Sequence, residues 1–153
     1  LLGQLAYFFQ GSKSKTEESA PEDWENLNGV RILAAEDNEL NREIIVELLE
    51  SHGAVVDTAC NGKEALDAYL NSSPGYYRLI LMDVHMPEMN GLEATKEIRN
   101  SGRPDACSVP IIAMTANAFS EDKQTAISVG MNGHVAKPID INVLLPMILK
   151  YMK

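Results

Sequence analysis

From residue 30 onward, short apolar runs alternate with stretches in which apolar residues recur every three or four positions. A short apolar run bounded by turn residues predicts a buried strand, whereas the wider spacing predicts an amphipathic helix. The run at residues 79–82 is the clearest strand, and Leu40, Ile44 and Ile45 show the helical spacing. The expected strands are residues 30–35, 54–59, 77–83, 109–114 and 133–136.

Polar residues and glycines mark where the expected helices begin and end. Asn38 and Asp140 can accept a hydrogen bond from a first-turn amide, and Gly53 and Gly130 suit helix ends. The expected helices lie within residues 39–52, 62–70, 92–100, 120–129 and 141–151.

Strands that alternate with helices predict an α/β fold, a doubly wound five-stranded parallel sheet with helices on both faces. We expect residues 29–153 to form this domain. Residues 1–28 are expected to be an N-terminal extension or linker, because residues 12–26 hold five acidic residues, two lysines and a single large apolar side chain. The apolar segment at residues 1–10 is too short to cross a bilayer.

The composition is that of an ordinary globular domain, with 45% hydrophobic and 23% charged residues. The formal net charge of −9 disfavours a nucleic-acid surface, which needs a basic patch, and suits a cation site. Cys60 and Cys107 lack metal-ligand spacing and are expected to be ordinary thiols of a reducing compartment. No apolar run approaches the length of a membrane span, so we expect no direct membrane insertion.

The carboxyl ends of the expected strands carry most of the candidate chemistry. Glu36 and Asp37 follow the first strand, and Asp83 ends the third. Thr115 follows the fourth strand and Lys137 follows the fifth. In a parallel sheet these ends share one edge, where ligands bind in open α/β folds. Three neighbouring carboxylates repel one another, so the set predicts a Mg²⁺ site, with Lys137 as a second positive charge.

Phosphoryl transfer onto Asp83 is the chemistry that fits this set. A carboxylate can act as a nucleophile and form an aspartyl-phosphate. A metal ion neutralises charge on the transferring oxygens, and Thr115 and Lys137 can hold those that remain. Because an ionised Asp83 is already a nucleophile, no strong general base is required.

Four motifs, at residues 35–38, 82–91, 113–116 and 137–138, read AEDN, MDVHMPEMNG, AMTA and KP. Each stands at the end of an expected strand. In this order they resemble the receiver domains of two-component signalling, and the resemblance extends from residue 30 to the end of the chain. It implies the flavodoxin-like (βα)5 fold and a phosphoacceptor function in a phosphorelay.

The resemblance implies a role for each acidic residue at this edge. Asp83 would be the phosphoacceptor. Asp37, Asp83 and the backbone carbonyl of His85 would ligate Mg²⁺ directly, while Glu36 would help through a water molecule. We further expect the His85 side chain to tune autodephosphorylation, so that replacement by Asn should change the dephosphorylation rate.

The resemblance also assigns roles on the last two strands. Thr115 would bond the phosphoryl group and move with it, Lys137 would pair with a phosphoryl oxygen, and the Lys137–Pro138 peptide bond would be cis. The sequence departs from the family three residues before this lysine. Receivers often have Tyr or Phe there, whereas this chain has His134, whose charge depends on pH.

The residues at 38–41 and the Met86-Pro87 pair are most similar to receivers attached to hybrid sensor histidine kinases. That similarity implies a histidine kinase or a histidine phosphotransfer domain as phosphodonor. It also implies a cytoplasmic location for this domain, within a parent kinase that could itself be membrane-anchored. We expect output through protein partners rather than nucleic acid, and the chain could form a homodimer. Whether self-catalysed phosphorylation makes it an enzyme stays open.

Two other classes of protein could use such a sheet edge. A small Mg²⁺-dependent phosphohydrolase of the aspartyl-phosphate type also has an Asp nucleophile, but typically has a second Asp two residues later, where this chain has His85. A flavodoxin-like electron carrier needs a phosphate loop rich in glycine and hydroxyl side chains after the first strand. The acidic residues at 36–39 would repel a phosphate, which disfavours that class.

Overall fold

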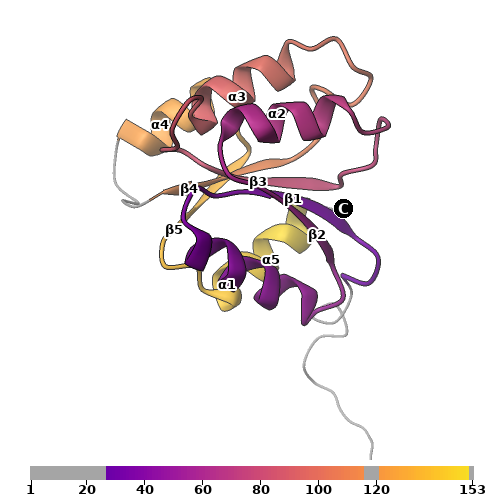
Figure 1. Cartoon of the computed structure of the whole chain (residues 1–153), viewed down its shortest axis with the longest axis vertical. Coiled ribbons are helices and arrows are strands. Elements are labelled where there is room, and N and C mark those ends of the chain that lie inside the picture. The colour runs from indigo at the N-terminus through magenta and orange to yellow at the C-terminus, as the bar shows by residue number, and fades with distance from the viewer. Residues whose placement is uncertain (1–26, 116–120, 152–153) are drawn as a thin grey trace, which may run out of the picture.

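The computed structural model describes residues 27–115 and 121–151 of the chain (Figure 1). Strands and helices alternate along it, as the sequence predicts. Asn38, Asn61 and Asn90 each cap a helix, because their side chains accept hydrogen bonds from first-turn amides. The elements are β1 (Arg31–Ala35), α1 (Glu39–Glu50), β2 (Val55–Ala59), α2 (Gly62–Leu70), β3 (Leu79–Asp83), α3 (Gly91–Arg99), β4 (Ile111–Thr115), α4 (Glu121–Ser128), β5 (Gly133–Ala136) and α5 (Ile141–Tyr151).

The five strands form one parallel sheet in the order β2-β1-β3-β4-β5. Figure 1 shows α1 and α5 on one face of the sheet and α2, α3 and α4 on the other. The strand order reverses between β1 and β3, which is the point in such sheets where a crevice opens at the carboxyl ends. The predicted doubly wound α/β fold is therefore confirmed.

The core has two parts, one on each face of the sheet. Ile32 and Ala34 of β1 belong to the part beneath α1 and α5, whereas Leu33 and Ala35 belong to the part beneath α2 and α3. This alternation follows from the two-residue period of a strand. Leu27 is fully buried in the first part, two residues ahead of the predicted domain start. Residues 1–26 of the predicted N-terminal extension lie outside the described residues.

The apolar residues of α1 differ in burial, which their helical spacing alone does not show. Leu40 and Ile44 of α1 have helical spacing but are exposed, whereas Ile45 and Leu49 are buried against the sheet. The reason is positional, because Ile44 lines a cavity of about 180 Å³ beside the β5–α5 loop rather than facing a strand. No helix in the described part of the chain is long and apolar enough to cross a membrane.

Candidate functional site

Asp83 is the last residue of β3, whose five residues are all buried. The residue is 2% exposed, and its strand lies between β1 and β4 in the sheet. The following loop is held close, since Gly91 donates its backbone N–H to the Val84 carbonyl at 3.0 Å. A Cβ at Gly91 would collide with the Asp83 carbonyl oxygen, so this contact requires glycine. The strand and the loop together fix where the carboxylate lies.

Glu36 and Asp37 form the turn between β1 and α1. Glu36 is almost fully buried, and its Oε1 accepts the backbone N–H of Asn38 at 3.1 Å. Asp37 is exposed to solvent. The backbone N–H of Glu36 still follows the sheet, because it donates to the Ala59 carbonyl at 3.0 Å. The turn therefore presents one buried and one exposed carboxylate at the edge of the sheet.

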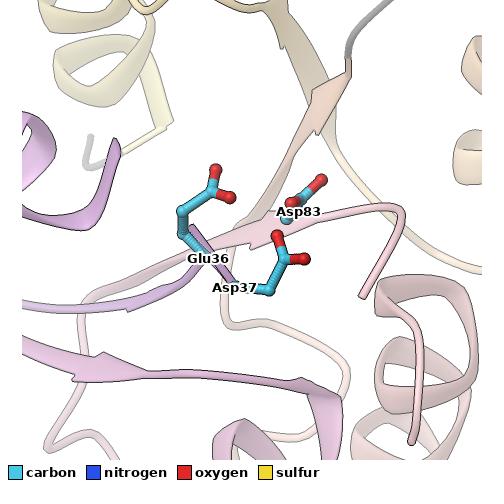
Figure 2. Close-up of side chains that lie close together, drawn as sticks. All are labelled: Glu36, Asp37 and Asp83. Carbon is cyan, nitrogen blue, oxygen red and sulfur yellow. The ribbon is translucent and has the colours of Figure 1, made fainter. Parts of the chain in front are cut away.

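The two elements bring three carboxylates together, as Figure 2 shows. One carboxylate oxygen from each of Glu36, Asp37 and Asp83 lies within 4.8 Å of the other two. Such a set repels itself when ionised, and oxygen ligands are those that Mg²⁺ prefers. The donor chemistry of this cluster therefore fits a hard divalent cation.

Lys137 supplies the positive charge at the same place. Its Nζ lies 2.8 Å from Asp83 Oδ2 and 2.9 Å from Glu36 Oε2. Its backbone N–H donates to the Thr115 carbonyl at 2.8 Å, which ties the β5–α5 loop to the end of β4. The Lys137–Pro138 peptide bond is cis, as the sequence resemblance implies. The ammonium group thus bridges two of the three carboxylates.

Burial and neighbouring charges change the acidity of these groups. Burial raises the pKa of Asp83 to about 6; the bond to Lys137 opposes this rise, and the charge of Glu36 adds to it. Burial alone would lower the pKa of Lys137, but its hydrogen bonds to Asp83 and Glu36 outweigh that effect and raise it. The Asp83 carboxyl therefore ionises less readily than an exposed carboxyl, whereas the neighbouring Lys137 ammonium keeps its proton to a higher pH than usual.

Thr115 ends β4, the strand next to β3, and is fully buried. Its Oγ1 has no hydrogen-bond partner among the described residues. A buried hydroxyl without a partner costs free energy, so it is a group that a bound ligand could satisfy. This observation agrees with the predicted contact between Thr115 and a phosphoryl oxygen.

The two histidines singled out in the sequence lie at different places. His85 is exposed, and its backbone N–H donates to Asp83 Oδ1 at 3.2 Å. His134 is in β5, in register with Ala113 of β4. Metal ligation by the His85 carbonyl and tuning of autodephosphorylation by the His85 side chain stay predictions.

Arg42 also belongs to the site, although it is not among the residues predicted from the sequence. Its Nη1 donates to the Glu36 carbonyl at 2.8 Å, from the second turn of α1. A lone arginine on a polar helix face has no distinctive sequence pattern, and the contact depends on the path of the turn. The other candidate residues, Glu36, Asp37, Asp83, Thr115 and Lys137, converge at the predicted edge.

Comparisons with known proteins agree with this geometry. Residues 32–149 match the family model described as the response regulator receiver domain. Hybrid signal transduction histidine kinase B of Dictyostelium discoideum is 41% identical over an alignment of 132 residues that covers 80% of this chain and 7% of that protein. The osmosensing histidine protein kinase SLN1 of Saccharomyces cerevisiae is 37% identical over an alignment of 131 residues that covers 84% of this chain and 10% of that protein. The chain thus spans a small part of these kinases.

Solved structures give the same result. The receiver domain of sensor histidine kinase PA1611 from Pseudomonas aeruginosa, with magnesium coordinated in its active-site cleft, matches with a TM-score of 0.73 and 35% identity, covering 81% of this chain and 98% of that one. The Saccharomyces cerevisiae co-crystal structure of the phosphotransfer protein Ypd1 with the Ssk1 receiver domain matches with a TM-score of 0.71 and 30% identity, covering 82% and 90%. The chain therefore belongs to the response regulator receiver domain family of two-component signalling.

Proposed function

We propose that Asp83 accepts a phosphoryl group from a phosphohistidine donor in a Mg²⁺-dependent phosphorelay step. One observation carries this proposal: a buried carboxylate at the end of a central strand lies within reach of two further carboxylates and of the Lys137 ammonium. Asp37, Asp83 and the His85 carbonyl would hold Mg²⁺ directly, and Glu36 would hold it through water. The bound cation would neutralise charge on the phosphoryl oxygens.

The transfer itself needs little from the protein beyond position and charge. A carboxylate oxygen of Asp83 bonds to phosphorus as the bond from phosphorus to the donor imidazole nitrogen breaks, and that nitrogen keeps the electron pair. Lys137 Nζ, which is ion-paired with Asp83 and Glu36 in the structure, can pair with an oxygen of the incoming phosphoryl group. The buried Thr115 hydroxyl can donate to another. These roles are electrostatic stabilisation at a preorganised site.

The surface beside the site suits a protein donor. Leu40 and Ile44 expose apolar side chains on α1, and Ile44 lines the small cavity that also reaches Lys137 and Ile139. Exposed apolar groups at the mouth of a polar site are typical of a docking surface. We propose that a histidine kinase or a histidine phosphotransfer domain docks there, and that the parent protein is a hybrid histidine kinase, as several relatives are.

Incubation with acetyl phosphate and Mg²⁺ tests the acceptor. The wild-type chain should gain the mass of one phosphoryl group, which is stable in acid and labile in base. Asp83→Ala should gain none, whereas Asp67→Ala, which removes an exposed carboxylate on α2, should behave as the wild type. Rapid turnover of the donor without an accumulating adduct would favour the phosphohydrolase instead.

The docking surface is tested with phosphorylated Ypd1 as donor. Leu40→Asp should slow transfer from Ypd1 relative to the wild type and leave phosphorylation by acetyl phosphate unchanged. Val143→Asp, which changes an exposed apolar residue on α5, is the matched control. Equal slowing of both donors by Leu40→Asp would count against docking and point to damage at the site.

A further inference from the structure

Four contacts hold Glu36 in place, and they involve four different residues. Its backbone N–H donates to Ala59, and its two carboxylate oxygens contact the Asn38 N–H and the Lys137 ammonium. Its carbonyl oxygen accepts from Arg42 Nη1 at 2.8 Å. Among the hydrogen bonds of the described residues, no other donor reaches this carbonyl. Arg42 therefore completes the fixation of this residue.

The Glu36 carbonyl belongs to the peptide unit that joins Glu36 to Asp37. A peptide unit is planar, so the direction of its carbonyl fixes where the Asp37 backbone starts. Arg42 is half-buried and lies six residues further along, on the helix that begins after this turn. Its bond thus ties the orientation of the turn to the body of α1.

We infer that Arg42 is a positioning residue for divalent-cation binding, which acts through the Glu36 carbonyl to hold the Asp37 carboxylate facing Asp83. This inference rests on the proposed function, since it concerns the same cation site. Groups that orient metal ligands without touching the metal typically contribute about 10- to 100-fold in metal affinity. Arg42 acts one step further out, through the peptide unit that precedes Asp37.

Charge and position make opposite predictions for Arg42. A guanidinium near a cation site repels the cation. If charge were the only effect, removing the Arg42 guanidinium would tighten Mg²⁺ binding. Loss of the carbonyl contact would instead loosen the turn and weaken binding. Arg42 also lines a groove of about 460 Å³ together with Glu39, Glu43 and Glu47, and the negative charge of these glutamates opposes its repulsion of a cation. The direction of the change in affinity therefore separates the two effects.

The experiment is Mg²⁺ titration of the metal-free chain by isothermal titration calorimetry at neutral pH. Arg42→Met keeps the aliphatic stem and should raise the dissociation constant about tenfold. Arg42→Lys should raise it less, because one ammonium donor can still serve one carbonyl. Arg78→Met removes an exposed arginine at the opposite end of the sheet and should leave the constant unchanged or slightly lower. Thermal unfolding of each metal-free variant shows that it is folded.

Two results overturn the inference. If Arg42→Met binds Mg²⁺ as tightly as the wild type, or more tightly, Arg42 does not position the turn, while phosphorylation of Asp83 still stands. A wild-type chain that does not bind Mg²⁺ would end both this inference and the proposed function. Arg42→Gln takes the place of Arg42→Met in the same comparison if the methionine variant does not fold.

Discussion

At the scale of single residues, the site is a buried acid whose charge the fold does not fully compensate. Asp83 reaches only Lys137 as a cation among the described residues, and it shares that ammonium with Glu36. Evolution of a stable core alone would favour a neutral side chain there. Burial of an incompletely compensated charge is the reason that the pKa of Asp83 is raised.

Asp83 should therefore make metal-free stability depend on pH. The folded chain binds the Asp83 proton more tightly than the unfolded chain does, because in the unfolded chain the Asp83 carboxyl has a pKa of about 4. Between pH of about 4 and about 6, its contribution to the free energy of unfolding falls as pH rises, by at most about 3 kcal/mol. The raised pKa of Lys137 adds no pH dependence between these values, because the stability that it contributes is lost only in strong base.

Urea unfolding in EDTA, at several pH values, measures this effect. The wild-type chain should lose stability relative to Asp83→Asn as pH rises through this window, because asparagine cannot ionise. Asp67→Asn, which changes an exposed acid, should track the wild type. A difference between wild type and Asp83→Asn that does not vary with pH would mean that the Asp83 pKa is not raised. Added Mg²⁺ in excess of EDTA should restore stability at neutral pH in the wild type and in Asp67→Asn, but not in Asp83→Asn.

At the scale of elements, the spacing of apolar residues and the helix-capping residues predict the order and type of all ten described helices and strands. What the pattern could not give was which side of α1 faces the sheet. Leu40 and Ile45 have equally apolar side chains, and the choice between them depends on how the helix crosses the sheet. The Arg42 contact is of the same kind, since it depends on the course of the turn.

The start of α3 is an element whose position the site depends on. Asn90 and Glu93 form a capping box there, and Gly91 brings the helix against the Asp83 carbonyl. Gly91→Ala should destabilise the chain by roughly 1–3 kcal/mol, because backbone atoms on both sides must move apart. It should also slow phosphorylation by acetyl phosphate. Lys96→Ala in the same helix is the control, and equal unfolding midpoints for the two variants would contradict the predicted close contact.

At the scale of the whole molecule, the two-part core explains why one edge of the sheet can be so polar. Each face is covered by helices, so stability does not rely on the crevice. The convergence of Glu36, Asp83 and Lys137 was predictable from parallel strands sharing an edge. The bridging of two carboxylates by one ammonium was not, since it depends on the conformation of the β5–α5 loop.

The core also extends further towards the N-terminus than the sequence pattern indicates. Leu27 is fully buried beneath α1 and α5, although it follows a linker-like segment. Leu27→Ala should lower the free energy of unfolding by about 2–5 kcal/mol, because it leaves a cavity. Leu40→Ala, at a leucine that is 64% exposed, should cost far less. Chemical denaturation compares the two, and similar losses would show that Leu27 is not part of the core.

The bridging ammonium has a mechanical consequence for the sheet. Lys137 joins the loop after the last strand to the ends of β1 and β3 through a single nitrogen atom. The proposed phosphorylation of Asp83 would convert one of the two carboxylates that this ammonium contacts into an acyl phosphate. The loop after the edge strand β5, which also holds the Thr115 carbonyl, would thereby respond to the chemical state of a residue two strands away from β5.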